Sequence, residues 1–296
     1  MIEIVFLGTG SMQPTRQRNH SGILLRFKEE NILFDCGEGT QRQMRIAGIK
    51  PAKITKILIS HWHGDHVFGI PGLLSAMGAD QFSKKLTIYG PPGTKRYLQH
   101  LLKSFAAKQI IDFEVKEVKS ETIFENNQFS LKTRALKHST LCVGYSFHEK
   151  DRKRIDVKKA KKLKLSGPIL GKLQKGETVK SGGKKIKSSD VTYVVKGKKV
   201  SYVADTVPCS GADALAKEAD LLISEGTHLD EIKDKTKKFM HLTVKQAALI
   251  AKKTKAKKLV VTHISPRYKN SKEVIKEAKK HFKESVVAED FMKIEL

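Results

Sequence analysis

The chain alternates short apolar runs with stretches in which apolar residues recur every three or four positions. This combination is typical of α/β proteins, where strands and helices follow one another. The expected strands are 2–7, 22–27, 32–34, 57–60, 86–89, 129–135, 143–147, 200–204, 221–224 and 259–262. The expected helices are 38–47, 94–105, 243–253 and 271–281, and a further apolar stretch covers 67–77. Strands outnumber helices, so the pattern predicts an α/β fold built on sheets.

Residues 150–190 interrupt this pattern with fifteen Lys or Arg against four Asp or Glu and few large apolar residues. Glycine-rich turns at Ser166-Gly167-Pro168 and Ser181-Gly182-Gly183 punctuate the segment. We interpret 150–190 as an inserted basic, flexible arm within one domain of residues 1–296. The alternative is a solvated linker without a specific role, because dense charge runs often have none.

The length and composition suit one sizeable core, with 296 residues of which 39% are hydrophobic. No run of about 18 apolar residues is present, and Met1 leads directly into a strand-like segment rather than a secretory signal. The three cysteines, Cys36, Cys142 and Cys209, show no CxxC spacing that would indicate a disulfide framework or a thiolate zinc site. A soluble, cytoplasmic protein with no membrane partner is expected.

The charge balance is strongly basic, with 57 Lys+Arg against 31 Asp+Glu and a formal net charge of +26. A lysine-rich surface could also reflect a heat-adapted protein, but that explanation predicts acidic residues to balance the lysines. The imbalance therefore favours a nucleic-acid partner. Aromatic residues make up only 7% of the chain, which argues against base stacking as the main mode of recognition.

Four possible metal ligands lie within six residues in the segment His61-Trp62-His63-Gly64-Asp65-His66. The segment follows an expected strand and opens an expected helix. Imidazole nitrogens and carboxylate oxygens are the donors that zinc accepts when thiolates are absent. Gly64 allows the tight backbone path that would bring both pairs of ligands together. The cluster outweighs the alternative that these are ordinary core histidines.

Further candidate ligands terminate three expected strands, where α/β folds place their chemistry. They are His138 after 129–135, Asp205 after 200–204 and His263 after 259–262. Five other histidines lack such a position or lie on polar faces, and no role is assigned to them: His20, His100, His148, His228 and His281.

The segment His61 to His66 matches the HxHxDH motif, and the arrangement resembles the metallo-β-lactamase superfamily from Phe34-Asp35 to His263. The resemblance implies an α/β fold of the αβ/βα four-layer sandwich type with two zinc ions per subunit. It assigns His61, His63 and His138 to one ion. It assigns Asp65, His66 and His263 to the other, with Asp205 bridging the two.

Narrower segments resemble the tRNase Z family. They are Phe6 to Gly10 with the loop Pro14 to Asn19, then Asp35 to Gln41, and then Asp156 to Ala160 with Gly167 to Val179. The resemblance implies that the basic segment is a protruding exosite arm that grips folded tRNA. Backbone phosphates attract Lys and Arg without regard to sequence, so binding should weaken with salt. The substrate-binding residues expected on this basis are Arg16, Arg18, Asn19, Gly167, Pro168, Lys172 and Lys175.

The same resemblance implies an endoribonuclease that removes the 3′ trailer from precursor tRNA, leaving a tRNA 3′-hydroxyl and a 5′-phosphorylated trailer. Zinc lowers the pKa of bound water to about 7, so a nucleophile is available at neutral pH. Asp65 is expected to serve as ligand and base, His241 as the acid that protonates the leaving oxygen, and Glu225 as the partner that holds His241. The family also implies a homodimer.

Three other interpretations compete. A small-substrate hydrolase of the glyoxalase II or cyclic-nucleotide phosphodiesterase type would use the same ligands, but it leaves the basic segment unexplained. A β-CASP nuclease needs a large additional domain for which this chain has no room. A non-catalytic RNA-binding protein would need only a closed structural zinc site with four protein ligands.

Overall fold

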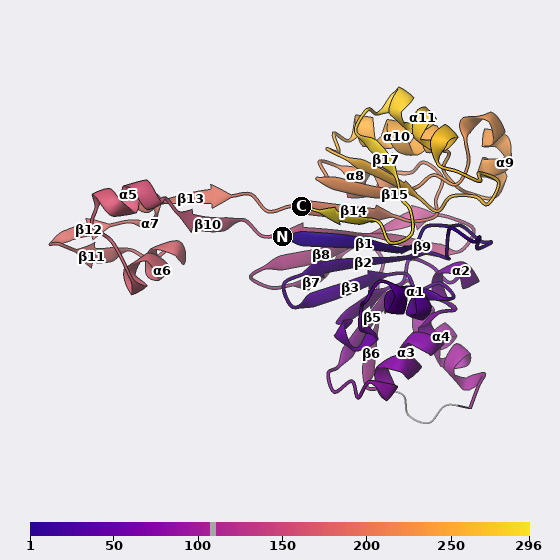
Figure 1. Cartoon of the computed structure of the whole chain (residues 1–296), viewed down its shortest axis with the longest axis horizontal. Coiled ribbons are helices and arrows are strands. Elements are labelled where there is room, and N and C mark those ends of the chain that lie inside the picture. Colours follow the sequence, from indigo (N-terminus) through magenta and orange to yellow (C-terminus); the bar gives the residue numbers. More distant parts are fainter. Residues whose placement is uncertain (107–110) are drawn as a thin grey trace. The chain divides into compact units, whose positions relative to one another are not determined.

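The computed structural model describes residues 1–106 and 111–296, and it divides into two compact units (Figure 1). The first unit comprises Met1–Phe124, Leu131–Phe147 and Lys199–Leu296, and the second comprises Glu125–Ser130 and His148–Lys198. Within the described ranges, no helix has the length and apolar character needed to cross a membrane. The larger unit contains all the candidate metal ligands.

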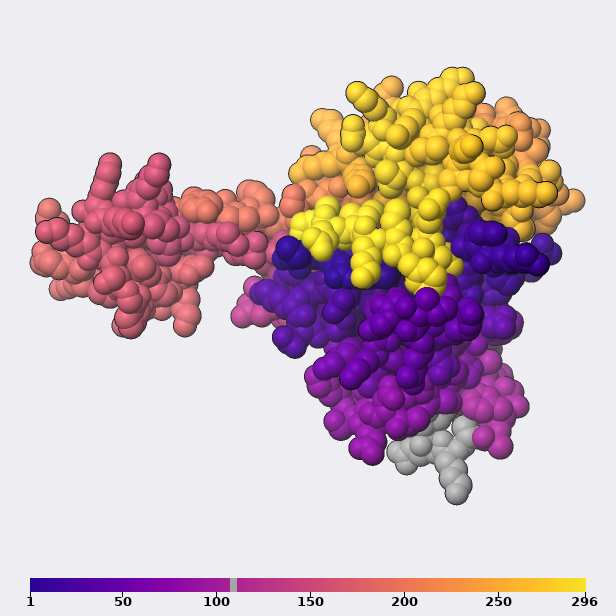
Figure 2. Space-filling view, viewed as in Figure 1, coloured from indigo at the N-terminus to yellow at the C-terminus, as the bar shows by residue number. Residues whose placement is uncertain are grey.

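Among the described residues, seven strands form the first sheet, in the order β18-β1-β2-β3-β4-β5-β6. The pairs from β18 to β3 are antiparallel, and those from β3 to β6 are parallel. Because β18 pairs with β1, the C-terminal residues lie against the N-terminal strand (Figure 2). The strands are β1 (Ile2–Gly8), β2 (Gly22–Phe27), β3 (Glu30–Phe34), β4 (Lys56–Leu58), β5 (Leu86–Gly90), β6 (Phe113–Glu117) and β18 (Lys293–Glu295).

The second sheet also has seven described strands, in the order β17-β16-β15-β14-β9-β8-β7. The four strands from β14 to β17 are parallel, so their carboxyl ends meet at one edge. The strands are β7 (Thr122–Glu125), β8 (Phe129–Lys137), β9 (Leu141–Glu149), β14 (Lys199–Val203), β15 (Leu221–Glu225), β16 (Leu259–Thr262) and β17 (Ser285–Val287).

Helices cover the outer faces of both sheets (Figure 1). Helix α10 starts with a capping box, in which the side chains of Thr243 and Gln246 each accept a hydrogen bond from the other residue's backbone. The helices beside the first sheet are α1 (Thr40–Ile46), α2 (Gly64–Val67), α3 (Ile70–Ala79) and α4 (Thr94–Lys103), with the 3-10 turn η1 (Pro51–Lys53). Those of the C-terminal half are α8 (Ser210–Ala216), η2 (Asp230–Ile232), α9 (Lys233–Lys238), α10 (Val244–Lys253) and α11 (Lys272–His281).

The two sheets pack face to face through buried aromatic side chains. The ring centroids of Phe34 and Tyr202 are 5.6 Å apart, and those of Phe27 and Phe147 meet edge to face at 5.2 Å. The buried hydroxyl of Tyr145 also crosses the interface and donates to the carbonyl of Ile59 at 2.7 Å. The expected helix–sheet–sheet–helix sandwich is therefore confirmed for the first unit.

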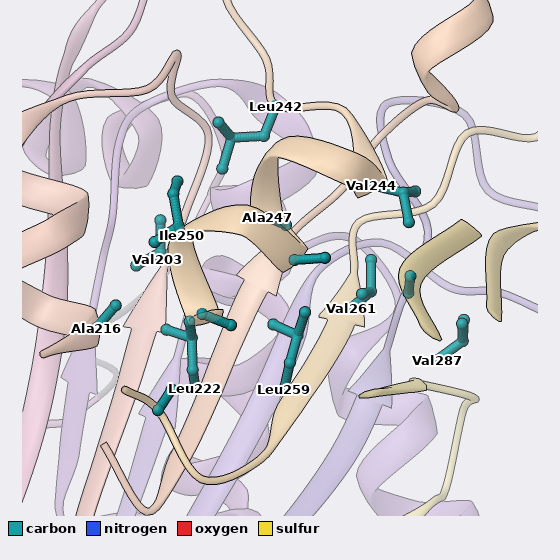
Figure 3. Close-up of a cluster of buried hydrophobic side chains, with 14 of the residues drawn as sticks. Val203, Ala216, Leu222, Leu242, Val244, Ala247, Ile250, Leu259, Val261 and Val287 are labelled. Atoms are coloured by element: carbon teal, nitrogen blue, oxygen red, sulfur yellow. The ribbon is translucent and has the colours of Figure 1, made fainter. Parts of the chain in front are cut away.

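A second layer of packing joins the second sheet to its helices (Figure 3). Leu222 and Leu259 on the strands are fully buried against Ala247 and Ile250 of α10. The small alanine lets the helix approach the strands closely. Burial of each leucine contributes about 1.5–3 kcal/mol of transfer free energy, so this layer fixes the strand ends that carry the site.

The second unit has a small core of its own, formed by Ala160, Leu165, Leu173, Ile186 and Val191. The glycine pair 182–183, with positive φ at both residues, turns one short hairpin. The elements are β10 (Arg152–Ile155), α5 (Val157–Lys162), α6 (Pro168–Gln174), β11 (Val179–Ser181), β12 (Lys184–Ile186), α7 (Ser188–Val191) and β13 (Thr192–Val195). The basic segment is thus folded rather than an extended linker.

Candidate active site

The candidate ligands meet at strand ends of the two sheets in the first unit. His61 follows β4, and the turn after it leads into α2 with Asp65 and His66. From the second sheet, His138 follows β8 and Asp205 lies just beyond β14. The structure brings all the sequence-predicted ligands to one place: His61, His63, Asp65, His66, His138, Asp205 and His263.

His61, His63 and His138 form the first group of converging donors. The Nε2 atom of His61 lies 3.0 Å from Nδ1 of His63, and Nε2 of His138 lies 3.2 Å from the same Nδ1. Burial, followed by the electrostatic effect of the neighbouring His66, lowers the pKa of His61 well below its usual value. His61 is therefore neutral at physiological pH, as a metal ligand must be.

Asp65, His66 and His263 form the second group. Nε2 of His263 lies 3.3 Å from Oδ2 of Asp65 and 3.3 Å from Nε2 of His66. Asp205 lies between the two groups, with Oδ2 3.7 Å from Nε2 of His61 and 3.5 Å from Nε2 of His66. This carboxylate can therefore contribute to either group.

The Nδ1 atoms of His61 and His66 belong to one buried hydrogen-bond network around the carboxylate of Asp35. Nδ1 of His66 donates to Oδ2 of Asp35 at 2.8 Å, and Nδ1 of His61 lies 3.0 Å from Oγ of Ser60. Asp35 also accepts hydrogen bonds from Ser60 and from the hydroxyl of Tyr202. With Nδ1 engaged, Nε2 of each ring is the nitrogen left to face a metal.

The rings of His138 and His263 are oriented by different partners. Nδ1 of His138 donates to the carbonyl of Met240 at 3.0 Å, and Nδ1 of His263 lies 3.0 Å from Oγ1 of Thr227. His63 differs, because its Nδ1 is the atom that faces the group. These supporting residues come from elements far apart in the sequence, so the sequence alone did not reveal them.

The donor set fits zinc. Imidazole nitrogens that face one another at about 3 Å carry lone pairs, and a shared cation removes their repulsion. Among the described residues, Oδ1 of the buried Asp205 has no hydrogen-bond partner, which leaves it free for a cation. Five histidines and two carboxylates, without any cysteine, give a nitrogen and oxygen donor set of the kind found in open catalytic zinc sites.

His241 lies beside this cluster at the loop before α10. Its Nδ1 lies 3.2 Å from Oε2 of Glu225 and 3.7 Å from Oδ2 of Asp205. Burial lowers the pKa of His241, but the carboxylates of Glu225 and Asp205 outweigh it and raise that pKa to about 9. Glu225 is itself fixed by the Thr227 hydroxyl, which donates to Oε2 at 2.7 Å.

The three candidate residues of the N-terminal loop, Arg16, Arg18 and Asn19, differ in exposure. Arg16 is exposed, whereas Arg18 is only 8% exposed. The guanidinium of Arg18 donates to Thr9 and to the carbonyl of Ala288, and the backbone N–H of Asn19 donates to Asp290. Arg18 and Asn19 therefore also fasten the loop to the C-terminal segment.

The remaining candidates lie in the second unit around the start and end of α6. Gly167 precedes the helix with φ of 64°, and Pro168 occupies its first turn. Lys172 in the last turn and Lys175 just beyond it are both exposed. Lysines at a helix C-terminus are favoured by the helix dipole, so they need no bound partner to be stable there.

Comparison with known proteins identifies the family. Residues 2–154 match the family model described as anti-Pycsar protein Apyc1, and residues 173–264 match a β-lactamase superfamily domain. Ribonuclease Z of Methanothermobacter thermautotrophicus is 41% identical, covering 100% of this chain and 97% of that protein. Ribonuclease Z of Bacillus licheniformis is 39% identical, with 100% and 99% covered.

A solved structure agrees with these sequence matches. The short form of human tRNase Z superposes with a TM-score of 0.74 at 31% identity, covering 99% of this chain and 98% of that one. The full-length matches extend over the metal cluster, the carboxylate-held histidine and the basic unit together. The chain belongs to the ribonuclease Z family of the metallo-β-lactamase superfamily.

Proposed function

We propose that this protein is a zinc-dependent endoribonuclease that removes the 3′ trailer from precursor tRNA, cutting after the discriminator nucleotide. One observation supports it above the others. A carboxylate-held histidine, His241, stands beside the metal cluster in a chain that matches ribonuclease Z over its full length. The net charge of +26 adds a reason to expect a polyanionic substrate.

Two zinc ions per subunit are proposed, one held by His61, His63 and His138 and the other by Asp65, His66 and His263, with Asp205 shared. When bound, zinc supplies Lewis acidity and lowers the pKa of coordinated water to about 7. The chain's own residues then have two tasks. They must hold the scissile phosphate, and they must deliver a proton to the leaving oxygen.

His241 is proposed to deliver that proton. Because Glu225 engages Nδ1, Nε2 is the ring nitrogen available to donate. In the hydrolysis, the oxygen of water bonds to phosphorus as the bond from phosphorus to the 3′ oxygen breaks. The proton from Nε2 gives the tRNA a 3′-hydroxyl, and the trailer keeps the 5′-phosphate. Asp65 is proposed to orient or deprotonate the attacking water as well as to bind metal.

The second compact unit is proposed to be the RNA-gripping exosite arm. Its exposed lysines, among them Lys172 and Lys175, suit contacts to backbone phosphates. Gly167 and Pro168 would shape the start of the helix that presents them. On the first unit, Arg16 is the exposed basic residue of the N-terminal loop, and we propose that Arg18 and Asn19 contribute to substrate binding with it.

We also propose that the protein is a homodimer and that it is cytoplasmic. Both proposals rest only on its membership of the family. Sedimentation equilibrium tests the homodimer directly, because a dimer of the 33.2 kDa chain has twice the mass of the monomer. A protein that sediments as a monomer at micromolar concentration would refute this part.

The function is tested by incubating end-labelled precursor tRNA with the zinc-loaded protein. A single cut after the discriminator nucleotide is expected, with no cut from Asp65→Ala, which controls for contaminating nuclease. If RNA stays intact while a small phosphodiester or thioester is hydrolysed, the small-substrate hydrolase interpretation replaces this one.

A further inference from the structure

An aromatic side chain stands exposed within the metal-binding segment. Phe68 follows α2 directly, two residues after His66, and 61% of its surface is accessible. Exposing a phenyl ring loses the stabilisation that burial provides, so packing does not explain a phenylalanine here. The neighbouring Val67 and Ile70 are buried in the core and do account for their own apolar character.

The ring of Phe68 is placed by Gly64. A β-carbon on Gly64 would fall 2.3 Å from Cε2 and 2.7 Å from Cζ of Phe68, so the ring edge lies against the glycine backbone. Gly64 separates the candidate ligands His63 and Asp65, whose Cα atoms are each about 3.8 Å from its own. The exposed ring therefore stands at the turn that carries His61 and His63 of the first group and Asp65 and His66 of the second.

We propose that Phe68 stacks on an unpaired base next to the scissile phosphate. The inference rests on the proposed function, because it needs a phosphodiester of single-stranded RNA at the metal cluster. In a nucleotide bound there by its phosphate, only the ribose separates the base from that phosphate, so the base lies near the cluster. A flat apolar ring is the surface that binds any base without selecting its identity.

Phe68 would then act at one nucleotide rather than along the RNA. The low aromatic content of the chain argues against stacking as the main source of affinity, and the basic unit is proposed to fill that role. A single ring beside the reacting phosphate instead fixes which bond is presented for cleavage. This makes Phe68 a positioning residue for the strand.

The test compares Phe68→Ala, Phe68→Trp and Phe105→Ala, which removes a partly exposed phenylalanine beyond α4. Phe68→Ala should lower kcat/KM for precursor tRNA by about 5- to 150-fold, the effect of losing one stacked base. Phe68→Trp should stay near wild type, and so should Phe105→Ala. Zinc content should be unchanged in all three.

A substrate carrying an abasic residue on one side of the cut separates stacking from a general defect. One of the two flanking abasic substrates should be cut equally slowly by wild type and Phe68→Ala, because the stacking partner is already missing. Equal cleavage of intact precursor tRNA by wild type and Phe68→Ala overturns the inference. So does an Ala penalty that persists in full on both abasic substrates, or a loss of zinc. If wild type cuts no precursor tRNA, the proposed function itself fails.

Discussion

At the residue scale, the position of His241 is compatible with two roles, a metal ligand and a general acid. It is 3.7 Å from Asp205, and the four side chains of Asp205, Glu225, His241 and His263 converge closely enough to hold an ion themselves. The hydrogen bond between Nδ1 of His241 and Glu225 favours the role of general acid. It occupies the ring nitrogen that faces Asp205, so that nitrogen is not left to bind a metal.

Substituting His241→Ala is expected to lower kcat for precursor tRNA by about 10²- to 10⁴-fold, the usual contribution of a positioned general acid. Zinc per subunit, measured by atomic emission, should equal that of the wild type. A loss of one ion in the variant would instead make His241 a ligand.

Asp35 is a second residue whose effect can be measured. Its carboxylate fixes His66 and accepts bonds from Ser60 and Tyr202, all buried. Asp35→Ala should weaken zinc binding by about 10- to 100-fold, because His66 loses the partner that sets its tautomer and orientation. Competition with a chromophoric chelator measures this.

Tyr202→Phe is the matched control for Asp35→Ala. It removes one donor to Asp35 and keeps the bond between Asp35 and His66. Zinc affinity close to wild type in this variant, beside a large loss in Asp35→Ala, would assign the effect to His66. Equal losses in both would show that only the buried network as a whole matters.

At the element scale, strands and helices with a clear local apolar pattern were predicted closely. Strand 259–262 coincides with β16, and 22–27 with β2, because each is a short segment rich in apolar residues. Strand β18 was not predicted, since Ile294 is its one apolar residue and its pairing with β1 is a tertiary effect.

In the candidate site too, residues with a local sequence pattern could be predicted, and residues placed by distant contacts could not. Its metal ligands are contiguous or terminate apolar runs, so their pattern could be recognised. Arg18 was predicted to bind substrate from the resemblance of its loop, but its hydrogen bond to the carbonyl of Ala288, 270 positions away, could not be predicted from the sequence. Long-range partners of this kind leave no local pattern in a single sequence.

We expect the first unit to keep its hydrolytic activity when most of the second compact unit is removed. Deleting residues 150–196 and joining the ends with a short Gly-Ser linker should raise KM for precursor tRNA and flatten its dependence on salt, because fewer phosphates are neutralised. Hydrolysis of bis(p-nitrophenyl) phosphate and the zinc content should be retained. The unit has its own apolar cluster, so the first unit loses none of its core.

The deletion also tests whether the second compact unit binds precursor tRNA. If KM and its salt slope match those of the full chain, the lysines of this unit do not bind the substrate. A variant with charge reversal only, such as Lys172→Glu with Lys175→Glu, repeats the test without altering the backbone. Both lysines are exposed, so their replacement should not disturb folding.

At the scale of the whole molecule, metal and stability are linked. The cluster joins ligands from both sheets, so an ion bound there connects the two halves of the sandwich. A ligand that binds only the folded state stabilises it by about 4 kcal/mol at 1,000 times its Kd.

Removing zinc with a chelator should therefore abolish cleavage and lower the melting temperature, as followed by circular dichroism. Readdition of zinc should restore both, whereas magnesium should not, since nitrogen-rich sites suit zinc better than magnesium. A melting temperature that does not respond to chelation would show that the ions contribute nothing to holding the sheets together.

The pairing of β1 with β18 also bears on how the protein is made. Strand β1 can pair with β18 only after residues 293–295 have been synthesised. Asp290, just before β18, holds Thr9, Asn19 and Gln43 in place beside the site. The N-terminal loop therefore gains these hydrogen bonds only after Asp290 has been synthesised. A nascent chain that has not reached Asp290 already carries the metal-binding motif but lacks the carboxylate that anchors its first loop.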